Sequence, residues 1–433
     1  MTATEDPAVP PGISADRTGM LALWGANGIS MLGGSMTTLA IPWFILATTG
    51  SAAKTGLVGT AIALGGMVAP VLSGPLIDRL GFKRASVLTD VADAVLVAAI
   101  PVLHAADLLQ FWHILVLAFL IQSMNAPGDA ARYALVPGLA HRAALTIERA
   151  NAVDRGIARI TMLVGPLIGG LLIAVIGPTN VLLLDALTFL ASAVLVALFV
   201  RPGSHEEGGA AAAQTSRSYR SELLVGLRFV FANGLLLSVV LLVSLANALD
   251  AALGAVVLPV YALQVWGSAT SFGVLTSAIS AGMLIGIAVF GAVGHHMPRR
   301  LTVLLGGAGG ALFLYGGLAL TPPLGVMVVL VVLGGILAGP IIPLLFTVVQ
   351  TQTPTELYGR VFGAMQSLTA VLPALSMTIV GLLIEGTGLV PTIVALGVLY
   401  LVVTLGMLVN PALRRMDTDR TADTAEDRPV TSP

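Results

Sequence analysis

Cysteine is absent from the 433 residues, and only 10% of them are charged. Without cysteine the chain cannot form disulfides, thiolate nucleophiles or Cys-based metal and iron–sulfur sites. The sequence also has no G-x-x-x-x-G-K-[ST] loop, which argues against a nucleotide-driven pump, and no His-Glu-x-x-His pair, which argues against an intramembrane enzyme. We therefore expect no catalytic residue, no metal site, no cofactor and no nucleic-acid partner.

Apolar residues dominate what is present. They make up 56% of the chain, the mean hydropathy is +0.96, and soluble domains carry about 25% charge against the 10% here. Runs of this length exceed barrel strands and lack their alternation, so we predict an all-α polytopic membrane protein. Hydropathy places twelve spans near 20–47, 55–77, 85–104, 109–127, 150–177, 179–200, 235–263, 268–294, 301–320, 323–349, 359–384 and 389–410.

The spans fall into two groups of six, separated by a polar interruption at Arg201–Arg220 that reads as a flexible linker. Next to the linker, Ser221–Asn233 has apolar residues at helical spacing and is predicted to lie along the membrane surface. No apolar segment typical of a signal peptide occurs at the start. The predicted domains are a cytoplasmic tail 1–19, a bundle 20–200, a linker with an amphipathic helix 201–234, a bundle 235–410 and a disordered tail 411–433.

The basic residues are distributed unequally between the two sides of the membrane. When loops are assigned alternately to the two sides, only Lys54 falls on the first side. Arg155 and Arg159 lie within a span, near its second-side end, and all the other basic residues fall on the second side. Cytoplasmic loops carry the excess of Lys and Arg. Both termini are therefore predicted to be cytoplasmic.

A charged turn separates the second and third spans. It reads Gly74-Pro-Leu-Ile-Asp78-Arg79-Leu-Gly81-Phe-Lys83-Arg84. A weaker copy lies between the eighth and ninth spans, where His295 follows Gly291 by four residues, as Asp78 follows Gly74. The copy favours two related halves.

This turn, between spans two and three of twelve, resembles the loop signature of the major facilitator superfamily. Further segments resemble its drug-efflux branch, the group of macrolide exporters, Tap-type multidrug pumps and enterobactin exporters. These segments are Ala40-Ile-Pro42, Pro127–Pro137, Gly165-Pro166 with Gly169-Gly170, Gly339-Pro340-x-x-Pro343 and Gly359-Arg360-Val-Phe-Gly363. The resemblance implies two six-helix bundles that open alternately to either side.

Two cytoplasmic gates follow from this resemblance. Asp78 would accept hydrogen bonds from the start of the eleventh span near Arg360, the alternative being a solvated basic turn. A second network would join residues at and before the start of the fifth span: Arg132, Asp154, Arg155 and Arg159. The Gly165-Pro166 and Gly169-Gly170 pairs resemble the motif associated with exporters, and simple helix packing is the alternative.

Ionisable residues inside spans are costly and usually functional. Asp250, about 20 Å deep in the seventh span, leads the proton-coupling candidates, against the alternative of a structural aspartate. Asp90 and Asp93 share a helix face one turn apart, so one could be protonated, or Asp90 could pair with a nearby arginine. Asp185 in the sixth span ranks lower.

The first span carries no acid at Ser30–Ser35, where relatives often have one, so coupling is expected elsewhere. Polar and large side chains within spans are the candidates for a substrate cavity, with helix packing as the alternative. The candidates are Asn27, Ser35, Thr38, Gln122, Met124, Asn125, Asn247, Phe346 and Gln350.

These observations favour a proton-driven exporter of lipophilic or amphipathic small molecules, working as a monomer in a bacterial cell membrane. Its expected partners are the substrate, protons and the bilayer. A dedicated exporter of one metabolite, such as a siderophore or an endogenous antibiotic, is the alternative. A receptor or scaffold would leave the buried acids unexplained.

Overall fold

The computed structural model describes residues 16–201, 219–294 and 297–409. Within these ranges twelve helices are long and apolar enough to cross a membrane, as predicted. The tails, the central part of the linker and His295 lie outside the described residues, so the predictions made for them are not tested. Helices suit the bilayer because each satisfies its own backbone polar groups.

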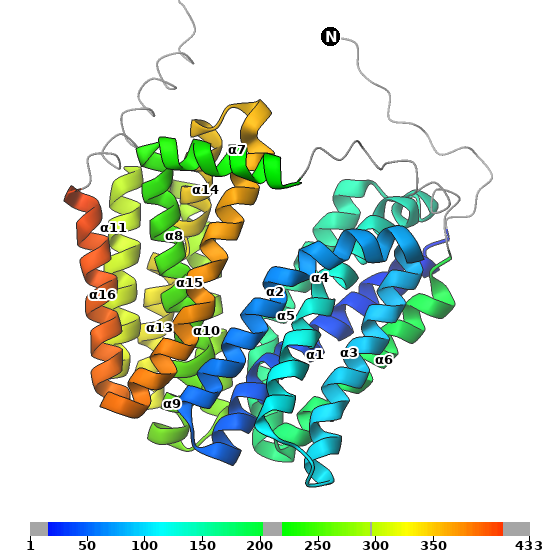
Figure 1. The fold of residues 1–433 in the computed structure, drawn as a ribbon, viewed down its shortest axis with the longest axis horizontal. Coiled ribbons are helices and arrows are strands. Elements are labelled where there is room, and N and C mark those ends of the chain that lie inside the picture. The colour runs from blue at the N-terminus through cyan, green and yellow to red at the C-terminus, as the bar shows by residue number, and fades with distance from the viewer. Residues whose placement is uncertain (1–15, 202–218, 295–296, 410–433) are drawn as a thin grey trace, which may run out of the picture. The chain divides into compact units, whose positions relative to one another are not determined.

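The first six spans are single helices that include several prolines. Proline is tolerated in membrane helices, where neighbouring helices satisfy the freed backbone groups. Figure 1 shows their course. The helices are α1 (Thr18–Thr49), α2 (Ala52–Leu80), α3 (Phe82–Ala105), α4 (Phe111–Arg142), α5 (Ile147–Ile176) and α6 (Pro178–Phe199).

Three of the later spans consist of more than one helical segment. The seventh is α8 (Gly234–Ala252), a π-helix (Leu253–Val257), α9 (Leu258–Tyr261) and a second π-helix (Ala262–Trp266). The ninth is α11 (Arg299–Gly309), a π-helix (Gly310–Gly316) and α12 (Gly317–Ala319), and the tenth is α13 (Leu324–Ala338) with α14 (Ile341–Gln352). The others are α10 (Ala269–Val293), α15 (Tyr358–Thr387), preceded by a short 3-10 turn (Thr355–Leu357), and α16 (Leu389–Val409).

The predicted charged turn is mostly helix. Since α2 continues to Leu80, Gly74, Asp78 and Arg79 belong to its last turns, and the prediction of a loop over these residues was wrong. Hydropathy falls before the helix ends because a helix can extend its charged last turn beyond the hydrocarbon core. Gly81 alone interrupts the backbone, with a φ of 75° that favours glycine, so the predicted tight turn at Gly81 is confirmed.

The fourth span is longer than predicted. It was expected to end at residue 127, but α4 passes through Pro127 and Pro137 and ends at Arg142. Arg132 therefore lies within a helix rather than in a loop, and it is only 4% exposed. Hydropathy missed this part because it contains three charged residues, Asp129, Arg132 and Arg142.

A helix at the predicted surface segment is confirmed as α7 (Tyr219–Ala232). It crosses the ends of the spans of the C-terminal part (Figure 1). Val230 is completely buried in a cluster with Leu236, Val348 and Val361. A Cβ atom added to Gly226 would collide with the backbone carbonyl of Arg360, so α7 packs closely on α15.

The chain divides into two compact units that do not follow the sequence halves. The first contains Met1–Thr38, Gly65–Gly165 and Thr179–Gln214; the second contains Leu39–Leu64, Pro166–Pro178 and Thr215–Pro433. Three helices, α1, α2 and α5, therefore each contribute one part to each unit. In α2 and α5 the division falls at a glycine, at Gly65 and at Gly165.

Small residues set the distances between helices. In the second unit, Cβ atoms on Gly335 of α13 and on Gly339, which directly follows α13, would lie 2.7 Å and 2.5 Å from carbonyl oxygens of α10. In the first unit, Gly33 of α1 faces Asp185 and Thr188 of α6, and a Cβ atom there would collide with both side chains. Such close approach is the usual basis of helix association in lipid.

Replacing Gly33 by alanine is expected to destabilise the α1–α6 contact. Because the new methyl group has no room, the cost should be about 1–3 kcal/mol. Gly34→Ala is the matched control, because a Cβ atom at Gly34 meets nothing within 4 Å. Thermal unfolding of the two purified variants in detergent tests this, and equal melting temperatures would contradict the packing described.

Candidate functional site

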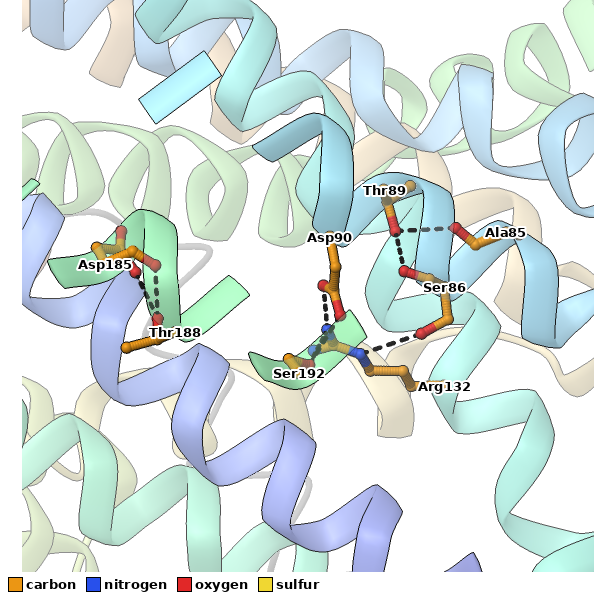
Figure 2. A network of polar contacts seen from close by, with 8 residues as sticks. All are labelled: Ala85, Ser86, Thr89, Asp90, Arg132, Asp185, Thr188 and Ser192. Carbon is orange, nitrogen blue, oxygen red and sulfur yellow. Dashed lines mark hydrogen bonds and ion pairs between the residues drawn. The ribbon is translucent and has the colours of Figure 1, made fainter. Parts of the chain in front are cut away.

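Arg132 of α4 lies at the centre of a buried polar network in the first unit (Figure 2). Its Nη2 forms an ion pair with Asp90 of α3 and donates to Ser192 Oγ of α6 at 3.1 Å. Its Nε donates to Ser86 Oγ at 3.3 Å, and Ser192 Oγ donates to Asp90 Oδ2 at 2.7 Å. All four residues are at most 4% exposed, so the network joins three helices inside the first unit. The arginine suggested as a partner of Asp90 is thus Arg132.

A second buried carboxylate lies on α6. Asp185 is completely buried and accepts hydrogen bonds from Thr37 Oγ1 of α1 and, at 2.9 Å, from Thr188 Oγ1 of its own helix. Gly33 of α1 leaves the space that this carboxylate fills. The Asp185 carboxylate therefore contacts α1, the helix that has no acidic residue of its own at Ser30–Ser35. Sequence reasoning ranked Asp185 low, and Gly33-Gly34 was the only local signal of a partner there.

Asp93 lies one helical turn from Asp90 and is 3% exposed. Its Oδ1 has no hydrogen-bond partner within the described residues. The Asp93 carboxyl interacts electrostatically with four charged side chains, those of Asp90, Asp185, Arg132 and Asp129. Since Arg132 is already paired with Asp90, an ionised Asp93 would carry a charge that no cation compensates.

Among the described residues, no hydrogen bond or ion pair joins any two of the four residues predicted to form a gate network at the start of α5. Asn27 Nδ2 of α1 donates to Asp154 Oδ1 at 2.8 Å, and both side chains are buried. The guanidinium of Arg155 lies 5.1 Å from the centre of the Tyr133 ring, close enough for a cation–π interaction. Arg159 is exposed, and Arg132 belongs to the Asp90 network instead.

The residues of the loop signature lie at the junction of α2 and α3. Asp78, Arg79 and Arg84 are exposed, whereas Lys83 Nζ donates to the backbone oxygen of Ala197 on α6 at 2.8 Å. Asp78 belongs to the first unit and Arg360 to the second. Their contact stays a prediction.

The Gly-Pro motif of α5 lies where that helix passes from one unit to the other. In the first unit, Gly165 faces Ser35 of α1, and a Cβ atom would collide with Ser35 Oγ. In the second unit, a Cβ atom on Gly170 would lie 2.7 Å from the backbone oxygen of Ala269 and 2.9 Å from Gly273 Cα, both of α10. Gly169 is also buried. The small residues therefore serve close packing, with α1 on one side and α10 on the other.

Asp250 lies near the end of α8 and is exposed. No hydrogen bond or ion pair joins its side chain to the described residues. Tyr315 and Tyr400 lie within its electrostatic reach, and Tyr315 belongs to a π-helix. Another π-helix begins three residues after Asp250, and such segments are frequent at functional sites.

Most of the predicted cavity residues make contacts within or between helices. Asn27 pairs with Asp154, the hydroxyl of Thr38 and the amide of Asn125 bond to carbonyls of their own helices, and Gln350 Nε2 donates to Tyr358 Oη at 3.1 Å. Phe346 lies 5.6 Å from the Phe362 ring, Gln122 packs on Gly65, and Met124 and Asn247 are half-buried. A cavity in the second unit is lined by residues outside this predicted set, including Leu242, Leu249, Tyr400 and Thr404.

Comparison with known proteins gives a consistent result. The model of the Major Facilitator Superfamily matches residues 23–251 and 240–432. The multidrug efflux pump Tap of Mycolicibacterium fortuitum is 31% identical over 89% of this chain and 94% of its own length. Tap of Mycobacterium tuberculosis is 30% identical over 94% of this chain and 96% of its own. The enterobactin exporter EntS of Escherichia coli is 30% identical over 59% of this chain and 58% of its own length.

Solved structures share the fold. The nucleoside transporter NupG covers 91% of this chain and 98% of its own, with a TM-score of 0.70 and 13% identity. A transporter of the POT family, solved with 5-aminolevulinic acid, covers 90% of this chain and 95% of its own, with a TM-score of 0.65 and 14% identity. The family and the relatives are transporters rather than enzymes.

The Arg132–Asp90 pair is expected to behave as a unit. Arg132→Gln leaves the buried Asp90 carboxylate without its cation and should cost about 3–5 kcal/mol. The double variant Asp90→Asn with Arg132→Gln removes both charges, so it should be more stable than Arg132→Gln alone. Thermal unfolding in detergent of the two single variants and the double variant measures the coupling. Additive losses would contradict the network.

Proposed function

Because this chain belongs to the major facilitator superfamily, we propose that it is a proton-driven exporter of lipophilic or amphipathic small molecules. The efflux direction is supported by the Tap and EntS relatives. In this proposal it works as a monomer in the cell membrane with both termini in the cytoplasm, and the proton gradient replaces a cofactor. A proton crossing 100 mV releases about 2.3 kcal/mol, and each pH unit adds about 1.4 kcal/mol.

The observation that carries the proposal is the unpaired carboxylate of Asp93. It is buried beside Asp90 and Asp185 with one guanidinium, Arg132, that Asp90 already engages. A net negative charge inside the membrane is costly, so a proton bound at Asp93 relieves it. When water reaches the cluster from one side, that proton can leave, which couples access to protonation.

The three proton-coupling candidates are thereby assigned different roles. Asp90 keeps its ion pair and holds Arg132 in place, and Asp93 carries the proton. Asp250 remains a second candidate carrier, because it has an exposed carboxylate near two tyrosines and π-helices.

The substrate class is supported by the relatives. Two relatives are named multidrug efflux pumps, and one is named an enterobactin exporter, so export of a single metabolite is the second candidate.

Proton coupling is tested with purified protein in proteoliposomes, using ethidium as a lipophilic cationic probe. With an acidic lumen, the wild type should accumulate ethidium, and dissipating the pH gradient should stop it. Asp93→Asn should lower the gradient-driven uptake by about tenfold or more. Asp107→Asn removes an equivalent charge from an exposed position with a φ of 56°, and it should transport normally.

The possible results of this experiment distinguish between proton antiport carried by Asp93, antiport carried by Asp250 and export of a single metabolite. Gradient-independent uptake would overturn proton antiport, and full uptake by Asp93→Asn with loss in Asp250→Asn would move the carrier to Asp250. If the wild type takes up no ethidium, but the addition of one metabolite changes the pH of the lumen, the result would favour the dedicated exporter.

The proposed orientation makes a separate prediction. Since the chain has no cysteine, single cysteines report without background. Lys54→Cys and Arg84→Cys replace exposed basic residues in the first turns of α2 and α3. In intact cells a membrane-impermeant maleimide should label Lys54→Cys at once and Arg84→Cys only after permeabilisation. The reverse pattern would place both termini outside.

A further inference from the structure

A polar contact joins the beginning of α2 to the end of α15. Ser51 Oγ donates to Glu385 Oε1 at 2.5 Å, and the backbone N–H of Ala53 donates to the same oxygen at 3.1 Å. Ser51 Oγ also accepts from the backbone N–H of Lys54 at 3.0 Å. A carboxylate at a helix N-terminus satisfies donors that the helix leaves free. Glu385 therefore caps a helix distant in sequence.

Below this cap the two helices touch through small residues. A Cβ atom on Gly381 would lie 2.5 Å from the backbone oxygen of Ala52, and one on Gly56 would collide with the backbone oxygen of Met377. One turn further, Thr60 Oγ1 donates to the backbone oxygen of Ala374 at 2.5 Å and lies 2.7 Å from Thr378 Oγ1. We call this the α2–α15 seam: Ser51, Ala52, Ala53, Gly56 and Thr60 against Ala374, Met377, Thr378, Gly381 and Glu385.

The same helix has a different partner in its second part. Gly65 lies against α4, where a Cβ atom would collide with the backbone oxygen of Phe119, and Ser123 Oγ donates to the oxygen of Gly65 at 3.4 Å. The division between the two units falls between Leu64 and Gly65. The α2–α15 seam is thus confined to the first three turns of α2.

The transport cycle proposed above requires these helices to part on the Lys54 side of the membrane, and on that basis we propose that Glu385 is the positioning residue that holds the α2–α15 seam closed as a gate. Its contacts are hydroxyl, amide and carboxylate groups, which water can replace when the helices part. The closest backbone contacts are made at glycine and alanine, and the side chain of Met377 lies against Gly59.

A reversible crosslink tests whether the seam must open. In the naturally cysteine-free chain, the pair Thr60→Cys with Thr378→Cys replaces two hydroxyls 2.7 Å apart across the seam. The control pair, Thr387→Cys with Thr392→Cys, replaces hydroxyls 3.1 Å apart at the α15–α16 connection. Oxidation should abolish gradient-driven ethidium uptake for the first pair only, and reduction should restore it. Normal uptake by the oxidised seam pair would overturn the gate.

Labelling tests Glu385 without any substrate. The single variant Thr60→Cys is combined with Glu385→Ala, Glu385→Gln or, as control, Glu356→Ala, which removes an exposed glutamate before the other end of α15. Loss of a charged hydrogen-bond acceptor should raise the rate of maleimide labelling about tenfold for Glu385→Ala. Glu385→Gln keeps an acceptor oxygen and should show a smaller rise. Equal rates for Glu385→Ala and Glu356→Ala would overturn the positioning role.

Discussion

Close approach of helix backbones is the constraint on which this structure depends. In lipid, apolar side chains gain nothing by leaving one apolar environment for another, so helices associate through packing and hydrogen bonds. Here glycine provides the approach at each contact described: Gly33 with α6, Gly165 with α1, Gly170 with α10 and Gly56 with α15. The polar groups of the protein interior occupy the places that these approaches leave. Asp185 fills the space opposite Gly33, and Ser35 fills the space opposite Gly165.

The buried charges of the first unit form a graded set. Asp90 and Arg132 neutralise each other and bind two serines, so they behave as a fixed cross-brace between α3, α4 and α6. Asp185 has two hydroxyl donors and no cationic partner among the residues that the structure describes. Asp93 has one oxygen without any donor among the described residues. Structural support thus decreases from Asp90 to Asp93, and chemical freedom increases in the same order.

Much of the fold was readable from the sequence, because apolar runs of about 20 residues determine spans and Gly81 determines a turn. The ends of spans were less readable. Hydropathy stops at charged residues, whereas α2 and α4 continue through Asp78 and Arg132. The pairing of Asp90 with Arg132 and of Asp185 with Thr37 joins residues 42 and 148 positions apart. Side-chain partners at such separations arise from tertiary packing, and no local pattern specifies them.

The division of α2 between two packing partners also has a consequence for recombination between related proteins. Its residues 52–64 are complementary to α15, although they belong to the N-terminal half of the sequence. A recombination event that joined the N-terminal half of this protein to the C-terminal half of a relative would separate Gly56 from Met377 and Ser51 from Glu385. Each of these two short segments therefore restricts which substitutions the other can accept, although most of the chain lies between them in the sequence.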